Sequence, residues 1–158
     1  MKRMRVRKTD SGVDDSGVGG AVHHHAQRVY IEDTDAGGIV YYANYLKFAE
    51  RARTEMLRAA GLSHAEMIEK DGLVLAVRRC EADFLKPARL DDLLDIASEV
   101  DEIAGASFSL RQAIRRGAED LCLIFVTIAC VNGTNRPTRL PEALRRVLSE
   151  SQSHPKQK

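Results

Sequence analysis

The sequence predicts an α+β domain in which one antiparallel, five-stranded sheet wraps around one long helix. Residues 44–60 repeat small and apolar side chains at helical spacing, and the segments after residue 72 repeat them at every second position. A short apolar run from about Gln27 to Glu32 precedes the helix and has the length of one strand. The order is therefore strand, long helix and four strands, which is typical of an antiparallel sheet packed on a helix.

Three consecutive histidines, His23–His25, stand directly before this first predicted strand. Histidine is a common metal ligand, but neighbouring side chains of an extended chain point to opposite faces and do not converge on one ion. We therefore predict a polar lead-in to the strand, and no metal site in the chain.

The predicted helix has an unusually small apolar stripe, and its charged residues fall mostly on the other faces. The stripe consists of Tyr45, Ala49, Ala52, Met56 and Ala59 or Ala60. Because alanine lets a sheet approach the helix axis closely, this stripe favours a helix wrapped by a curved sheet over a helix in a bundle.

Gly61 is expected to end the long helix, since glycine readily adopts the left-handed conformation found after helix C-termini. Ser63 and Glu66 have the spacing of a capping box and predict a short second helix. His64 would lie in the first turn of that helix, on the surface.

The second half of the chain alternates apolar and polar residues, as half-buried strands do. The alternating apolar or small positions are Cys80, Ala82 and Phe84, then Leu94, Ile96, Ser98 and Val100, then Phe108, Leu110 and Ile114. Turn signals at Pro87, at Ala104-Gly105 and at Arg116-Gly117 separate the runs. Residues 121–131 are apolar almost throughout, so we predict a strand near the sheet centre or on a covered face, and Pro141 then starts a short terminal helix.

Length and composition indicate one domain. At 158 residues the chain is long enough for one core and too short for two ordinary ones. Residues 1–22 are rich in Lys, Arg, Asp, Ser and Gly and predict a disordered tail. We assign the folded domain to residues 23–150 and a flexible C-terminal tail to residues 151–158.

The net charge of +1 indicates neither a nucleic-acid partner nor an acidic interaction tail. No run is long enough to span a bilayer and no apolar signal core follows Met1, so a cytoplasmic location is expected. Cys80, Cys122 and Cys130 lie among apolar neighbours without paired spacing, which predicts buried free thiols.

Two carboxylates, Asp33 and Asp35, stand between the first strand and the long helix. The N-terminus of a helix offers free N–H groups and a positive dipole end, which can polarise a carbonyl beside an acid group. An Asp-x-Asp-x-Gly segment is also ordinary turn chemistry, and Asp33 is interpreted as such a turn or capping residue. Three of the four tyrosines, at positions 41, 42 and 45, follow at once and suggest a lined pocket.

These features resemble the hotdog-fold thioesterases of the 4-hydroxybenzoyl-CoA thioesterase superfamily, most of all the acyl-CoA thioesterases associated with the Tol-Pal envelope system. The resemblance covers residues 28–148 and depends on three motifs in the same order. They are the segment YIEDTDAGGIVYYANY at Tyr30–Tyr45, ERARTEML at Glu50–Leu57 and KPARLDD at Lys86–Asp92.

The resemblance implies that Asp35 is the catalytic carboxylate, as nucleophile or as general base, and that the backbone N–H near Tyr42 polarises the thioester carbonyl. Gly38, Tyr41, Tyr42 and Asn44 are the predicted substrate-binding residues. Similar chains often carry His at the position of Tyr42 and Tyr at that of Ile31, so a histidine-assisted mechanism is not expected here. No cofactor is required.

The resemblance also implies homodimers with a continuous sheet and the active site at the subunit interface, and often homotetramers. Coenzyme A would need a local basic surface for its phosphates. Candidates are Arg78, Arg79, Lys86 and Arg89, which could equally be solvated outer faces of strands.

Two alternative functions stay open from the sequence. An acyl-ACP thioesterase would dock an acidic acyl carrier protein beside the same pocket. A non-catalytic acyl-binding or envelope-associated interaction module would keep the fold, but an intact Asp35 argues against this alternative, because a carboxylate beside an acyl group costs stability unless it serves chemistry.

Overall fold

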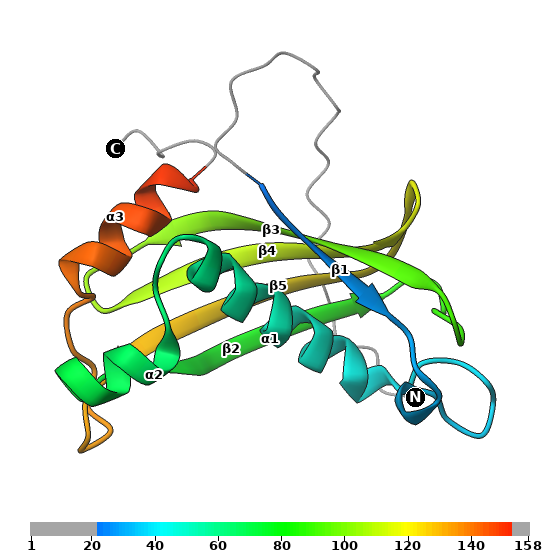
Figure 1. Cartoon of the computed structure of the whole chain (residues 1–158), viewed down its shortest axis with the longest axis horizontal. Coiled ribbons are helices and arrows are strands. Elements are labelled where there is room, and N and C mark those ends of the chain that lie inside the picture. Colours follow the sequence, from blue (N-terminus) through cyan, green and yellow to red (C-terminus); the bar gives the residue numbers. More distant parts are fainter. Residues whose placement is uncertain (1–21, 153–158) are drawn as a thin grey trace, which may run out of the picture.

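The computed structural model describes residues 22–152, which form a five-stranded sheet with one long helix lying across one face (Figure 1). The strands pair antiparallel in the order β1-β3-β4-β5-β2. The predicted α+β class and strand count are confirmed. The two predicted tails fall almost entirely outside the described residues.

The order of the elements is the predicted one. They are β1 (His23–Arg28), the 3-10 turn η1 (Ile31–Asp33), α1 (Tyr42–Ala59), α2 (His64–Glu66), the π-helical turn η2 (Met67–Asp71), β2 (Val74–Phe84), β3 (Leu93–Ile103), β4 (Ser107–Arg116), β5 (Glu119–Val131) and α3 (Glu142–Glu150). Strand β5 lies between β4 and β2, which confirms its predicted interior position. Strands β1 and β2 are the two edges.

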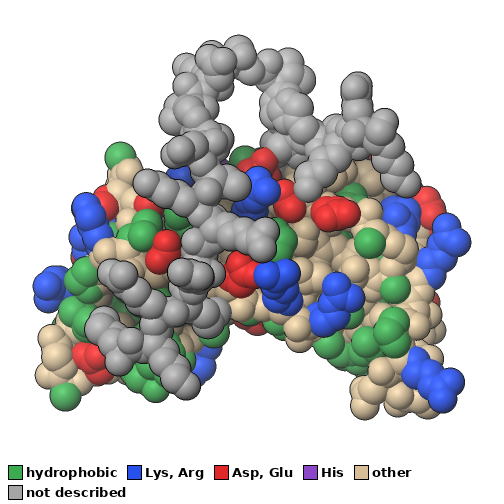
Figure 2. Space-filling view, turned by 180° about the vertical axis from the view of Figure 1, so that it is seen from behind, with side chains coloured by type: hydrophobic (Ala, Val, Ile, Leu, Met, Phe, Trp, Pro, Cys, Tyr) green, Lys and Arg blue, Asp and Glu red, His purple; other side chains and the backbone are tan. Residues whose placement is uncertain are grey.

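Helix α1 contacts the sheet through the predicted Tyr45, Ala49, Ala52 and Met56, whereas Ala59 and Ala60, which were expected to extend this stripe, are exposed. Ala49 and Ala52 are fully buried and share one core cluster with Phe48, Ile96 and Ile114. Because methyl side chains take little room, the strands can approach and curve around the helix. Among residues 22–152, no helix combines the length and the hydropathy that a membrane crossing requires. The opposite face of the sheet has acidic and basic side chains interspersed (Figure 2).

The predicted boundaries of the first strand are wrong. Strand β1 spans His23–Arg28 rather than 27–32, and the histidines belong to the strand instead of leading into it. They pair with residues 96–98 of β3. Local pattern could not reveal this, because the partner strand lies about seventy residues away and strand propensity depends strongly on such context. No cluster of three metal-ligating side chains occurs within the described part of the chain.

The signals around the helix ends are confirmed with one exception. Gly61, the residue after the C-cap Ala60 of α1, has a φ of 81°, and Ser63 Oγ accepts a hydrogen bond from the Glu66 N–H at 3.1 Å. His64 is half-buried rather than on the surface, and its Nε2 lies in a crevice beside Leu57 and Val77. This crevice is lined by residues of α1 and β2 together with His64 of α2, which accounts for the partial burial of the ring.

All three cysteines are free, as predicted. Cys122 and Cys130 are buried and Cys80 is half-buried. Burial raises the pKa of the Cys122 thiol to about 12, so the thiolate is scarce at neutral pH. These thiols therefore serve as small core side chains.

Candidate active site

Asp33 is a structural residue that fixes the chain between β1 and α1. Its Oδ2 accepts a hydrogen bond from the Tyr30 N–H at 2.8 Å, and its side chain is buried. Its carbonyl oxygen accepts the Tyr41 N–H and the side-chain Nδ2 of Asn44, each at 2.9 Å. The predicted turn role of Asp33 is thus confirmed. Asn44, one of the predicted substrate-binding residues, is buried, and its side chain holds this turn.

Asp35 lies at the tip of the same turn with its side chain exposed. A short ladder of backbone hydrogen bonds holds the turn. The Asp35 N–H donates to the Ile39 carbonyl at 2.9 Å, and the Gly38 N–H donates to the Asp35 carbonyl at 3.0 Å. Gly38 has a φ of 75°, which glycine adopts without strain. The tight loop therefore presents a carboxylate outward from a fixed backbone.

Gly37 orients the Asp35 carboxylate. Its N–H donates to Asp35 Oδ1 at 2.8 Å, which leaves Oδ2 without a hydrogen-bond partner among residues 22–152. A Cβ atom at position 37 would lie 3.1 Å from Asp35 Oδ1, so a larger residue would push against the carboxylate. One oxygen is thus anchored, and the other can act on a ligand.

The N-terminus of helix α1 lies at the other end of this ladder. Thr34 pairs with Val40, and the next pair joins Asp33 to Tyr41, the N-cap of α1. No side chain caps the helix there, so its first N–H groups, at Tyr42 and Ala43, have no intrahelical acceptor. The positive end of the helix dipole therefore stands beside the Asp35 turn.

An aromatic cluster flanks the helix N-terminus. The Tyr42 ring lies 4.9 Å from that of Tyr41 and 6.0 Å from that of Phe84, at the end of β2. Tyr45 is 5.6 Å from Phe84 and buried, and its hydroxyl accepts the Ala88 N–H at 2.9 Å. Tyr41, Tyr42 and Phe84 are exposed and form an apolar wall. The sequence pattern predicted only that Phe84 lies on a half-buried strand. Its position at the end of that strand was the one sequence feature that could have indicated a place in this cluster.

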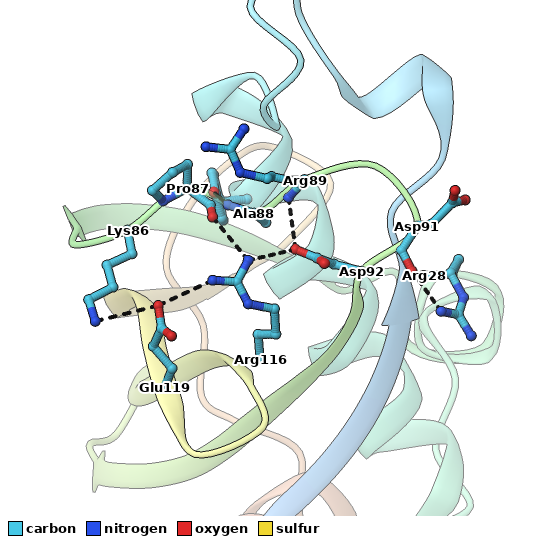
Figure 3. A network of polar contacts seen from close by, with 10 residues as sticks. Arg28, Lys86, Pro87, Ala88, Arg89, Asp91, Asp92, Arg116 and Glu119 are labelled. Carbon is cyan, nitrogen blue, oxygen red and sulfur yellow. Dashed lines mark hydrogen bonds and ion pairs between the residues drawn. The ribbon is translucent and has the colours of Figure 1, made fainter.

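The loop between β2 and β3 lies against the Asp35 turn. Ile39 pairs with Arg89, and the Val40 N–H donates to the Ala88 carbonyl at 2.9 Å. Two of the predicted phosphate contacts, Lys86 and Arg89, are on this loop. Lys86 Nζ lies 3.5 Å from Glu119 Oε1, whereas the Arg89 side chain points away from the network that holds the loop (Figure 3).

Arg116 organises that network. Its Nη1 donates to Asp92 Oδ2 at 2.8 Å and to the Pro87 carbonyl at 3.3 Å (Figure 3). Asp92 Oδ2 also accepts the Arg89 N–H at 2.9 Å. Burial opposes ionisation of Asp92, but these hydrogen bonds and the Arg116 charge outweigh it and hold the pKa of Asp92 below its ordinary value. The ionised carboxylate therefore fixes the loop that carries Arg89.

The other two basic candidates, Arg78 and Arg79, are not brought to the Asp35 turn within one chain. A register shift between Val77 and Arg79 leaves Arg78 in a bulge. Arg79 forms an ion pair with Glu81, and both arginines line a shallow groove with Phe125 and Thr127, on the sheet face opposite to α1.

The fold and this turn define the class of protein: the chain belongs to the thioesterase-like superfamily, which it matches over residues 29–148. Among its relatives, the acyl-CoA thioesterase YbgC of Haemophilus influenzae is 41% identical over 119 residues, 75% of this chain and 88% of that protein. The acyl-CoA thioester hydrolase YbgC of Escherichia coli O6:H1 is 41% identical over 120 residues, 74% of this chain and 88% of that protein.

Solved structures agree with this assignment. The crystal structure of a probable thioesterase from Bartonella henselae has a TM-score of 0.74 and 40% identity, and covers 77% of this chain and 100% of that chain. The resemblance to hotdog-fold thioesterases that three sequence motifs indicated is thereby confirmed.

Proposed function

We propose that the protein is an acyl-CoA thioesterase, which hydrolyses an acyl-CoA to the free acid and coenzyme A. The observation that supports it most is the position of the Asp35 carboxylate. This carboxylate is exposed and accepts a hydrogen bond from the Gly37 N–H through one oxygen. A short ladder of backbone hydrogen bonds joins its turn to the uncapped N-terminus of α1. The names of the relatives that are 41% identical over about three quarters of the chain support the same activity.

This arrangement suffices for thioester hydrolysis. Sulfur donates poorly into the carbonyl, and thiolate is a good leaving group. In the general-base route, Asp35 removes a proton from water as the water oxygen bonds to the carbonyl carbon. The N–H groups of α1 stabilise the oxyanion, the carbon–sulfur bond breaks, and the thiolate receives the proton.

The nucleophilic route uses the same groups. Asp35 Oδ2 bonds to the carbonyl carbon and the thiolate leaves; water then hydrolyses the mixed anhydride to the free acid and the Asp35 carboxylate, and the remaining proton of that water neutralises the thiolate. Both routes need one free carboxylate oxygen and donors for the oxyanion. Asp35 and the N-terminus of α1 supply them.

A thiol-release assay over a panel of substrates tests the function. The panel contains short aliphatic, long aliphatic and aromatic acyl-CoA esters and one acyl-ACP. We expect coenzyme A to be released from at least one acyl-CoA ester in a steady turnover. Release from acyl-ACP alone would contradict the proposed carrier, and no release from any substrate would contradict the enzyme.

Arg89 is the predicted phosphate contact that the structure favours, because its loop pairs with Ile39 and its side chain extends away from the Asp92 network. We predict that Arg89→Ala raises KM for acyl-CoA by roughly three- to tenfold with little change in kcat, since an exposed ion pair contributes about 1 kcal/mol. Arg146→Ala, at an exposed position of α3, is the control. An unchanged KM in Arg89→Ala would contradict the contact.

We propose that the active site is completed in a homodimer. Strand β2 is a sheet edge of eleven residues, and Val77, Phe84 and Leu85 on or beside it are about half exposed. Exposed hydrophobic edges favour pairing with another chain. Tyr42 and Leu46 of α1 extend this apolar surface. A partner strand there would cover the aromatic wall and enclose the acyl group.

We predict a dimer or tetramer at micromolar concentration, measured by light scattering. Val77→Glu should shift the population toward monomer and lower turnover in parallel, because a buried charge would oppose the pairing. Glu150→Gln, at an exposed position of α3, should change neither property. A fully active monomer would contradict the shared site.

We predict that Tyr42→Phe leaves kcat/KM within about threefold of the parent value, since the proposed contribution of position 42 is its backbone N–H. The pH–rate profile should lack an ionisation near the ordinary histidine pKa of about 6.5 and show only a carboxylate limb at low pH. A loss in Tyr42→Phe comparable with that of an Asp35 variant would show that the phenol itself is catalytic.

A further inference from the structure

A groove crosses the sheet face opposite to α1 and has a volume of about 430 Å³. Its floor follows the strand register: Ala97 pairs with Ala113, which pairs with Leu123, which pairs with Asp83. The two alanine side chains are short, so the surface is hollowed along this row, and the longer residues of the neighbouring row form a rim. That rim consists of Glu99, Arg111, Phe125 and Glu81.

The groove has an excess of available negative charge. Its arginines are engaged by aspartates, Arg111 by Asp101 at 2.7 Å and Arg115 by Asp120 at 2.6 Å. Of its three carboxylates, Glu81 pairs with Arg79. The other two, Asp83 and Glu99, have no ion-pair partner among the residues that the structure describes.

The described chain begins at this groove. Val22 lines one end of it, directly before β1. The residues that precede Val22 include a basic cluster, Lys2–Lys8, with five Lys or Arg residues and the apolar Met4 and Val6. Positive charge and two apolar side chains complement the carboxylates of Asp83 and Glu99 beside an alanine and leucine floor.

The connecting segment has the required length. Thirteen residues rich in Gly, Ser and Asp, Thr9–Ala21, separate the basic cluster from Val22. For Gly- and Ser-rich chains of that length, the root-mean-square end-to-end distance is roughly 20 Å. Four strand spacings, from β1 to β2, amount to about 19 Å. The reach of the connecting segment therefore matches the width of the groove. This match would give the basic cluster a high effective concentration at the groove.

We propose that residues 2–8 of the chain bind in this groove, with Met4 and Val6 on its floor and the arginines near Asp83 and Glu99. The proposal departs from the expectation that all of residues 1–22 form a disordered tail. A second copy of the chain is a less suitable occupant of this face. In a two-fold symmetric pair, Asp83 and Glu99 of one copy would face the same carboxylates of the other copy, and the like charges would repel each other. The groove is on the sheet face away from Asp35, so turnover is not expected to depend on it.

Photo-crosslinking in the full chain tests the proposal. The photoreactive residue p-benzoylphenylalanine replaces Met4, or Val18 as control, and mass spectrometry locates the crosslinks. We expect Met4 crosslinks concentrated on peptides that contain Ala113 or Leu123. A mixture of ¹⁵N-labelled and unlabelled chains shows whether the two peptides come from one chain or from two copies.

Charge variants decide whether the groove recognises the cluster. Asp83→Asn with Glu99→Gln should lower the yield of these crosslinks roughly three- to fivefold at low salt, as expected for two exposed ion pairs. The matched change Glu142→Gln with Glu150→Gln on α3 should leave it unchanged. Three outcomes would overturn the proposal. They are crosslinks scattered over the surface, a crosslink yield that does not change in the Asp83 and Glu99 variant, and crosslinks that form only between two copies.

Discussion

Replacing Asp35 by asparagine is expected to remove most of the hydrolytic activity while the fold survives. Asparagine keeps the shape of the side chain, and its Oδ1 can still accept the Gly37 N–H that orients the carboxylate. It can neither remove a proton from water nor attack the carbonyl. A positioned proton-transfer group contributes about 10²–10⁴-fold, so kcat/KM should fall by that factor.

Two variants of the same segment are the controls. Glu32→Gln makes the same carboxylate-to-amide change at an exposed position three residues away and should keep normal turnover. Asp33→Asn keeps an acceptor for the Tyr30 N–H and should affect activity less than Asp35→Asn. Circular dichroism checks the fold. A folded Asp35→Asn protein with near-normal turnover would remove Asp35 from the mechanism.

The order of elements could be predicted because periodicity is local. The alanine stripe of α1 and the alternating runs of β3 and β4 each show one buried face in the sequence itself. The role of Asp33 was also accessible, since an aspartate capping the N–H of a residue three positions away, Tyr30, is short-range chemistry.

What the sequence left open depends on contacts between distant residues. The histidines of β1 become strand residues only because β3 pairs with them. Phe84 joins Tyr42 because β2 ends beside the start of α1. In the sequence, Arg79 and Arg89 are equivalent candidates, because both are basic residues after the long helix. In the structure, the loop between β2 and β3 brings Arg89 to Ile39, whereas Arg79 lies on the sheet face opposite to α1.

The second large effect is expected for Arg53, which anchors α1 to the middle of the sheet. Its guanidinium is buried, donates from Nη1 to Gln112 Oε1 at 2.7 Å, and pairs with Glu50. Gln112 in turn donates from Nε2 to Ser98 Oγ at 2.9 Å and to the Ala49 carbonyl at 3.0 Å. The network joins the helix to the central strand β4 and to its neighbour β3.

We predict that Arg53→Ala lowers the free energy of unfolding by about 2–4 kcal/mol, because Gln112 Oε1 stays buried without a donor and the packing of the arginine stem is lost. The melting temperature should fall by roughly 5–15 °C for a chain of this size. Urea and thermal denaturation at one fixed protein concentration measure both, since assembly makes stability concentration-dependent.

Two further variants separate the network from a general effect of charge. Arg58→Ala removes an exposed arginine from the same helix and should cost less than about 0.5 kcal/mol, although it also loses its pair with Glu55. Arg53→Met with Gln112→Leu and Ser98→Ala removes the buried polar side chains of the network together and should recover much of the loss, since apolar replacement of a whole buried polar group is often nearly neutral. Equal stabilities of Arg53→Ala and Arg58→Ala would show that the buried network contributes nothing beyond surface charge.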